Sequence, residues 1–372
     1  MAQNITPYEV KGSVDYQKLI SDFGLKPLEG STAKRFDRLA GESNYMIRRG
    51  IYFAERDLAW LLDEYEKGNR FYVYTGIAPS GSMTIAQTMH FQMAKWLQDR
   101  FGAEVLIMIP DEEKFLVKRN PAFTLESGHE LAMEDALDIA ALGFNSKKTR
   151  IFLDTEYAKT LYKQAVRISK YITYSIIKDA FGFGNDTNVG ALFYTSLQAA
   201  PAFLKSVQEG KNVPCLIPMG VDQDVHFRVA RNAIGKLGYY KPAAILSKFV
   251  PSLSMDPKMS ASDPNGAIYL SDDEAAVAKK INKAITGQQS TAELQKKFGG
   301  DPEKCAVYQY YKFLFEPDDG KLEQIFNSER NGTLLAGEHK KDLASRINHF
   351  LNEHRERKKR IKPRLADFML SD

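Results

Sequence analysis

Apolar positions follow two different spacings through the middle of the chain. An aromatic and β-branched run at 71–74 predicts a strand, and a loop rich in Gly, Ser and Pro follows it. Met89, Met93 and Trp96 then recur at helical spacing, which predicts a helix, and the apolar run 105–109 predicts a second strand. The pattern is typical of a strand–loop–helix–strand unit.

The same alternation continues to about residue 246. Helices are expected near 129–142, between about 157 and 182 and around 226–237, and strands at 150–153, 215–218 and 244–246. Apolar strands that alternate with helices predict an α/β fold with a mostly parallel sheet covered on both faces. From about Asp272 the strand pattern stops, and glycine turns separate what we expect to be helices.

The first seventy residues have a mixed, largely polar composition. Their main apolar cluster includes Tyr52, Phe53, Leu58 and Trp60, and we expect it to lie in one helix that ends near Gly68. The chain is therefore predicted to divide into an N-terminal extension (1–70), a parallel-sheet domain (71–270) and a helical domain (271–372).

Length and composition limit the classes of protein to which the chain can belong. With 372 residues and 44% apolar content the chain is long enough for large packed cores. It has no uninterrupted apolar stretch of about 18 residues and no secretory leader pattern, so we expect an intracellular protein without a membrane span. Cys215 and Cys305 are its only cysteines, so neither a disulfide framework nor a CxxC zinc site is predicted, and no metal ligands are assigned.

The formal net charge of +4 is unevenly distributed. Residues 355–364 contain seven basic and one acidic side chain, a local charge of +6 that leaves −2 for the rest. Such a segment suits a polyanionic partner, because lysine and arginine neutralise phosphates. A solvated helix face explains the same pattern equally well.

Three segments carry candidate chemistry. The small residues of 75–82 would let backbone N–H groups approach a phosphate, or would form a plain turn. Asp111, Glu112 and Glu113 suit either a binding site or an acidic helix start. Lys258-Met259-Ser260-Ala261-Ser262-Asp263-Pro264 would clamp a polyphosphate with one ammonium and two hydroxyls, or form a solvent loop.

This last segment resembles the KMSKS loop of class I aminoacyl-tRNA synthetases, in the form found in tryptophanyl-tRNA synthetases of the eukaryotic and archaeal type. Further segments resemble that family in the same order, from about residue 70 to near the end of the chain. They are Tyr74-Thr75-Gly76 with Pro79-Ser80, KWLQD at 95–99, DEEK at 111–114, GFGNDTN at 182–188, Gln198-Ala199-Ala200-Pro201, Cys215 to Pro218, Val221 to Asp224, Phe298-Gly299-Gly300 and Lys321 to Ile325.

The resemblance implies a Rossmann-type catalytic domain, a helical anticodon-binding domain and a cytoplasmic homodimer. It also implies the family reaction, in which ATP with Mg²⁺ and tryptophan form tryptophanyl-adenylate, and the aminoacyl group then moves to tRNA. Matched position by position, the residues divide into three groups. Tyr74, Met108, Glu113, Gln198 and Gln223 would bind tryptophan; Gly76, Ala86, Lys258 and Met259 would line the ATP site; and Lys258, Ser260, Ser262, Gln87 and Thr84 would be catalytic.

The chain departs from the family at three places. Where the family carries its HIGH signature, this chain has Thr84-Ile85-Ala86-Gln87, which removes both histidines and the glycine but retains an amide and a hydroxyl. Ile77 replaces an arginine near the phosphates, and Met108 replaces a glutamine that helps Tyr74 to recognise the indole. The preceding loop is also one residue shorter.

These departures leave three alternatives. The first is a working tryptophan–tRNA ligase in which other groups compensate for the lost ones. The second is a non-catalytic or strongly impaired homologue with a tRNA-binding, protein-binding or regulatory role. The third is a synthetase that activates another amino acid, suggested by Met108, because a pocket that lacks a polar contact discriminates less well.

Overall fold

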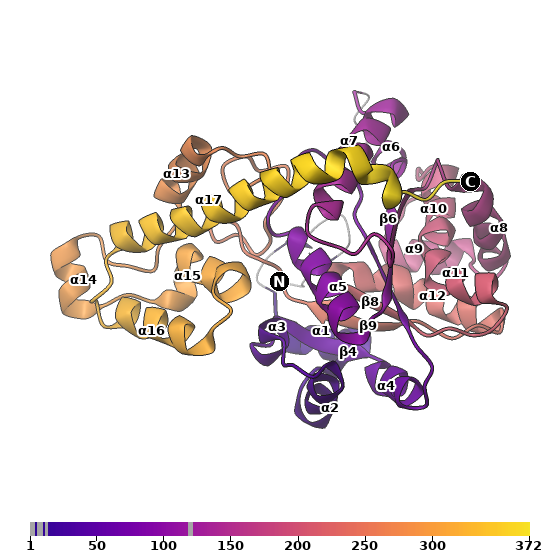
Figure 1. Ribbon diagram of the computed structural model, residues 1–372, viewed down its shortest axis with the longest axis horizontal. Helices are drawn as coiled ribbons and strands as arrows, with labels where there is room; N and C mark the ends of the chain where they lie inside the picture. Colours follow the sequence, from indigo (N-terminus) through magenta and orange to yellow (C-terminus); the bar gives the residue numbers. More distant parts are fainter. Residues whose placement is uncertain (1–3, 6–9, 12–13, 118–121) are drawn as a thin grey trace.

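A seven-stranded sheet forms the centre of the computed structural model, which describes residues 4–5, 10–11, 14–117 and 122–372 (Figure 1). In spatial order its strands are β3 (Lys26–Pro27), β4 (Tyr52–Arg56), β9 (Ala243–Ser247), β8 (Cys215–Gly220), β5 (Tyr72–Gly76), β6 (Glu104–Ile109) and β7 (Thr149–Leu153). The five strands from β9 to β7 pair in parallel, and β3 and β4 extend one edge antiparallel. The predicted mostly parallel α/β fold is confirmed.

Successive residues of the central strands enter two different cores. On β5, Val73 packs in the core beneath α5, whereas Tyr72 and Tyr74 pack in the core on the opposite face of the sheet. Because both faces are buried, the strand has no polar side, which is why it reads as a continuous apolar run.

Helices cover both faces of this sheet. They are α1 (Tyr16–Phe23), α2 (Gly30–Ala40), α3 (Tyr45–Arg48), α4 (Leu58–Glu66), α5 (Thr88–Phe101), α6 (Glu113–Val117), α7 (Leu125–Ala140), α8 (Ala158–Ser169), α9 (Tyr174–Phe181), α10 (Val189–Ala199), α11 (Pro201–Glu209) and α12 (Asp224–Lys236). Apart from the sheet, β1 (Asn4–Ile5) and β2 (Val10–Lys11) form a separate antiparallel pair. Among the described residues no helix combines the length and apolar character that a membrane crossing needs.

The predicted single helix across the N-terminal apolar cluster is wrong. Tyr52 and Phe53 belong to β4, Asp57 adopts a left-handed backbone conformation with φ of 54°, and α4 begins only at Leu58. The carboxylate of Glu55 accepts a hydrogen bond from the N–H of Leu58 at 2.7 Å and so caps this helix. A fully buried strand lacks alternation, so periodicity does not separate it from a buried helix.

The N-terminal region also contacts the C-terminal helices. Arg48 and Arg49 both donate to the carboxylate of Asp319, at 2.9 and 2.7 Å, and Tyr45 donates to the carbonyl of Phe313 at 3.1 Å. The start of the predicted extension, at 1–3, 6–9 and 12–13, lies outside the described residues. The proposed domain boundaries at 70 and 270 stay predictions.

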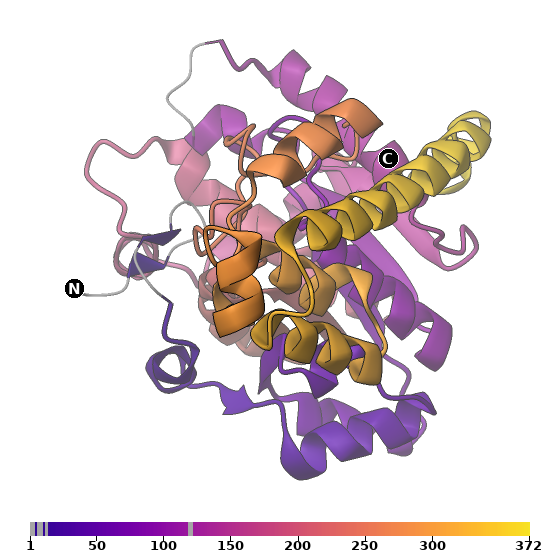
Figure 2. The same ribbon diagram turned by 90° about the vertical axis from the view of Figure 1, so that its left-hand side faces the viewer.

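Beyond Asp272 the described chain is helical, apart from one bridge between Met369 and Ile151 of β7. The helices are α13 (Glu274–Lys283), α14 (Ala292–Phe298), α15 (Ala306–Tyr310), which a π-helical turn (Tyr311–Phe315) continues, α16 (Asp319–Arg330) and α17 (Ala336–Ile361). Figure 2 turns this helical part, in orange and yellow, toward the viewer. In Figure 1, α17 runs from it to the sheet, where it packs on α7.

The basic segment 355–364 forms the end of α17 and the turn after it, and part of its charge is used within the chain. Lys358 pairs with Asp138 at 2.8 Å and with Glu134 at 3.0 Å, and Arg357 donates to the carbonyl of Ala141, just after α7. Nε2 of the buried His354 lies 3.0 Å from the same Asp138. Lys359, in contrast, is largely exposed, so for the exposed part of the segment a polyanion contact and a solvated helix face both stay predictions.

We predict that Lys358→Ala lowers the free energy of unfolding by about 1–3 kcal/mol, because it leaves the buried Asp138 carboxylate without its ammonium partner. Lys359→Ala is the matched control: its pair with Glu356 is exposed and screened by solvent, so no measurable change in stability is expected. Urea denaturation of the two variants measures the difference. Equal destabilisation would mean that Lys358 does not hold α17 against α7.

Candidate active site

A cavity of about 410 Å³ opens at the carboxyl ends of β5, β6, β8 and β9, where ligands bind in parallel α/β sheets. Twelve of the thirteen site residues predicted from the sequence line it. These twelve are Tyr74, Gly76, Ala86, Gln87, Met108, Glu113, Gln198, Gln223, Lys258, Met259, Ser260 and Ser262. Thr84 is the exception, because it is buried in a bridge to Tyr269.

The inner end of the cavity combines aromatic surface with hydrogen-bonding groups. The hydroxyl of Tyr74 donates to the carbonyl of Gln198 at 2.9 Å and lies 3.0 Å from Sδ of Met108. Burial raises the pKa of Tyr74 well above its usual value, so the phenol stays neutral. Since its single proton is donated to the carbonyl, its oxygen is available to accept from an N–H of a ligand.

Two further groups at this end are suited to a cation. Glu113, the first residue of α6, accepts from the hydroxyl of Tyr194 at 3.0 Å and pairs with Lys114 at 3.2 Å. The side-chain amide oxygen of Gln198 is buried without a hydrogen-bond partner among the described residues. Because a buried acceptor left unpaired is costly, it favours a bound donor such as an ammonium group.

Behind Glu113 lies a group of acids that do not line the cavity. Burial raises the pKa of Glu112 to about 7 and raises the pKa of Asp154 far above its usual value. The nearby Glu112 raises the pKa of Asp154 further, whereas a hydrogen bond with Asp154 lowers the pKa of Glu112. Of Glu112, Glu113 and Asp154, Glu113 is the one that lines the cavity.

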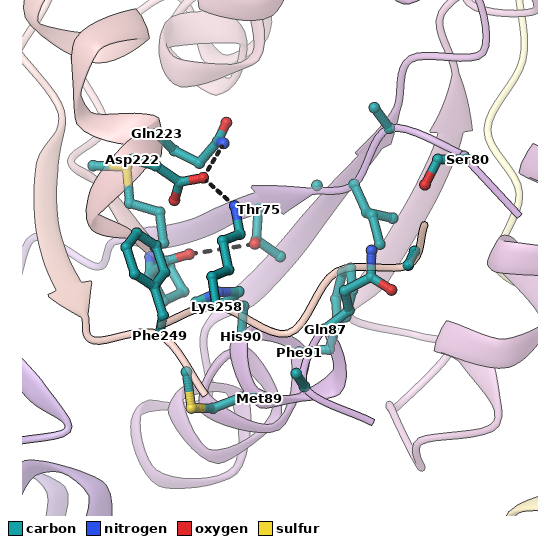
Figure 3. A pocket seen from close by; sticks show the side chains of 18 of the residues that line it. Thr75, Ser80, Gln87, Met89, His90, Phe91, Asp222, Gln223, Phe249 and Lys258 are labelled. Atoms are coloured by element: carbon teal, nitrogen blue, oxygen red, sulfur yellow. Dashed lines mark hydrogen bonds and ion pairs between the residues drawn. The ribbon is translucent and has the colours of Figure 1, made fainter. Parts of the chain in front are cut away.

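At the outer end, Lys258 forms an ion pair with Asp222, with Nζ 2.6 Å from Oδ2 (Figure 3). Gln223 donates to the same carboxylate oxygen at 3.2 Å, and the ring of Phe249 lies beneath the ammonium at 5.2 Å. The loop is anchored by the buried Met259, whose N–H donates to the carbonyl of Val250 at 2.8 Å.

The two serines of this loop are exposed and 2.8 Å apart, oxygen to oxygen. Hydroxyls and an ammonium at the mouth of the cavity are donors for an anion. The loop therefore has the chemistry of a phosphate-binding segment.

The Thr84–Gln87 segment supplies another donor. The side-chain oxygen of Gln87 accepts from N and Oγ1 of Thr84, at 2.7 and 3.2 Å, which fixes the orientation of the amide. Its nitrogen is then left for the cavity, as Figure 3 shows. Thr84 thus positions Gln87 rather than contacting a ligand itself.

His90 also lines the cavity, and sequence reasoning missed it. Nδ1 of its ring lies 3.1 Å from the hydroxyl of Tyr52, and burial lowers the pKa of His90 to about 4, so the ring is neutral. When Tyr52 donates to Nδ1, the ring proton lies on Nε2, which is then a donor. The signal was present in the sequence, since His90 follows Gln87 by three residues, about one turn of α5.

Gly76 is required by a close approach of two strands. A Cβ atom at this position would lie 2.4 Å from the carbonyl oxygen of Met108, its partner on β6. No side chain fits such a contact without displacing the backbone, which explains the glycine at the end of β5.

Residues 66–352 match the model of the family described as class I tRNA synthetases (W and Y). The chain belongs to this family. It is 42% identical over 367 residues to the tryptophan–tRNA ligase of Pyrobaculum calidifontis, covering 99% of this chain and 97% of the relative. Identity to the ligase of Saccharolobus solfataricus is 44% over 360 residues, 96% of this chain and 93% of that one.

A solved structure supports the same assignment. The tryptophanyl-tRNA synthetase of Encephalitozoon cuniculi bound to tryptophan superimposes with a TM-score of 0.87 at 35% identity, over 97% of this chain and 99% of that one. The predicted family and its Rossmann-type fold are thereby confirmed.

We predict that Gly76→Ala lowers the free energy of unfolding by about 1–3 kcal/mol, because the added methyl group overlaps the backbone of β6. Gly337→Ala provides the matched control, since nothing lies near its Cβ position in the first turn of α17, and a gain of about 0.4–1 kcal/mol is expected there. Urea denaturation distinguishes the two. A Gly76→Ala variant as stable as the parent would show that the strands separate freely at this point.

Proposed function

We propose that this chain is a tryptophan–tRNA ligase, which activates tryptophan with ATP and transfers the aminoacyl group to tRNA. The observation that carries the proposal is one cavity that joins an aromatic, ammonium-binding end to a cationic end, in a chain 42% identical to such ligases over 99% of its length. Nothing in these comparisons favours the non-catalytic alternative.

At the inner end the indole N–H of tryptophan donates to the hydroxyl oxygen of Tyr74. Glu113 and Gln198 at this end, together with Gln223 from beside Asp222, hold the α-ammonium and carboxylate groups, since a carboxylate and amides satisfy an ammonium in a pocket with little water. The thioether of Met108 packs against the ring without adding a strong hydrogen bond.

At the outer end the phosphates of ATP meet Lys258, Ser260 and Ser262, with Gln87 and His90 as neutral donors. Mg²⁺ enters with the nucleotide as part of the substrate. The carboxylate of tryptophan attacks the α-phosphorus of ATP, the bond to the β-phosphate oxygen breaks, and pyrophosphate leaves with its charge stabilised by the ammonium of Lys258.

The amide of Gln87 takes over a donor role that histidine has in the HIGH signature. Because Thr84 fixes the amide oxygen, the nitrogen presents its hydrogens to the cavity without a reorganisation cost. His90 adds a second neutral donor one turn further along α5. These two groups are the proposed compensation for the missing imidazoles.

Assembly as a cytoplasmic homodimer is part of the proposal. Apolar side chains that are 44–79% exposed gather on α8, α9 and the start of α10, as expected of a surface that a second subunit covers. They are Tyr162, Val166, Tyr174, Ile176 and Val189.

The helical residues 271–372 are proposed to read the anticodon. Among the basic residues near the end of the chain, Lys359 and Arg364 keep exposed charges for the tRNA backbone.

ATP–pyrophosphate exchange with each of the twenty amino acids tests the activity. We expect exchange that depends on tryptophan, and we expect Lys258→Ala to reduce it on the order of 100- to 1000-fold, because the variant removes a cation from the developing charge. Lys359→Ala, far along the chain on α17, is expected to leave exchange unchanged. Exchange that depends on another amino acid, or on none, would contradict the proposal.

If the parent is inactive, a second variant identifies the cause. It combines the substitutions Thr84→His, Ala86→Gly and Gln87→His. Exchange by this variant alone would mean that the chain binds tryptophan but that its own residues do not support the ATP chemistry. An inactive variant would mean that the pocket no longer serves this reaction.

A further inference from the structure

Three side chains with metal-binding atoms meet inside the helical part of the chain. They are Cys305, immediately before α15, Glu329, near the end of α16, and His339, in the first turn of α17. Their thiol, carboxylate and imidazole ligand atoms all lie within 4.8 Å of one another. Each residue is at most 1% exposed, and the three segments lie side by side at the left of Figure 1.

The polar atoms of this cluster are poorly satisfied by the protein. Neither carboxylate oxygen of Glu329 and neither ring nitrogen of His339 has a hydrogen-bond partner among the described residues. The thiol of Cys305 and the amide of Gln288 lie against the carboxylate, and both amide atoms of Gln288 are themselves unpartnered. Buried polar atoms are rarely left unpaired, so this concentration of them points to a missing partner.

Within the part of the chain that the structure describes, no lysine or arginine forms an ion pair with Glu329. Among the described ion pairs Glu329 has only His339, with Nδ1 3.4 Å from Oε2. A buried carboxylate without a cation is costly, so a cation bound at this place would stabilise it.

We propose that Cys305, Glu329 and His339 bind one zinc ion. Thiolate, carboxylate and imidazole are zinc ligands with bond lengths of about 2.0–2.3 Å, so their atoms come within about 4 Å of each other around a tetrahedral ion. The ligand atoms of the cluster lie within 4.8 Å of one another, so a small inward movement would bring them to these distances. Calcium and magnesium prefer oxygen ligands throughout and do not suit a thiol and an imidazole.

Charge and protons balance in such a site. The thiol of Cys305 loses its proton to solvent on binding, and the thiolate and the carboxylate together neutralise Zn²⁺. The buried side-chain oxygen of Gln288, which lies against the same carboxylate, is available for the fourth position. The ring of Tyr311 stacks on His339 at 5.1 Å and 10°, which holds the imidazole in place.

The role of the ion is structural. It would join the starts of α15 and α17 to the end of α16. The site is separate from the cavity at the sheet, so the proposal holds or fails independently of the ligase activity.

Metal analysis of the full chain, purified without chelators, tests the proposal directly. We expect about one zinc per chain in the parent and in Cys215→Ser, and loss of the zinc in Cys305→Ser. Cys215 is the matched control because it is the other buried free cysteine and lies on β8. A parent without zinc that also fails to take up added Zn²⁺, or a Cys305→Ser variant that keeps its zinc, would overturn the proposal.

Cobalt substitution gives a second readout that needs no folded Cys305 variant. In the Cys215→Ser chain Cys305 is the only thiol, so a thiolate-to-metal charge-transfer band after Co²⁺ loading assigns the ligand. The absence of this band would overturn the assignment of Cys305. Removing zinc from the parent with a chelator should also lower the melting temperature by about 5 °C or more, and added Zn²⁺ should restore it.

Discussion

The ion pair between Lys258 and Asp222 is the interaction on which the geometry of the site depends. It joins the loop that follows β9 to the turn that follows β8, two strands that lie side by side in the sheet. The loop contains proline, glycine and serine and has no regular structure, so this pair and the anchor at Met259 determine where its donors lie. In the proposed reaction the ammonium would exchange the carboxylate of Asp222 for a phosphate of ATP, and much of its desolvation cost would already have been met.

A second constraint connects the two ends of the molecule. The helix α17 leaves the helical part and reaches α7, where Asp138 binds both His354 and Lys358. Arg48 and Arg49 link the N-terminal region to Asp319 in the same helical part. Charged contacts from three regions of the sequence therefore set the position of the helices relative to the sheet.

Much of the fold and of the site could be predicted from the sequence, for identifiable physical reasons. Strands β5, β6 and β8 are buried on both faces and therefore appear in the sequence as apolar runs. Tyr74 lies on β5, Glu113 follows β6 and Lys258 follows β9, and the carboxyl ends of these parallel strands meet at the cavity. β4 was missed because a buried strand lacks alternation. His90 was missed because its role depends on which face of α5 meets the cavity.

The cluster around Cys305 could not be recognised from spacing, since its ligands come from three separate segments brought together only by folding. The role of Thr84 was also invisible, because it rests on the orientation of one amide.

The central claim is that the amide of Gln87, held by Thr84, serves the ATP chemistry in place of a histidine. Single-turnover formation of tryptophanyl-adenylate by the parent, Gln87→Ala and Gln87→His tests it most directly. The account predicts that Gln87→Ala slows adenylate formation on the order of 100-fold or more while tryptophan binding stays intact, and that Gln87→His remains active. An undiminished rate in Gln87→Ala would contradict it.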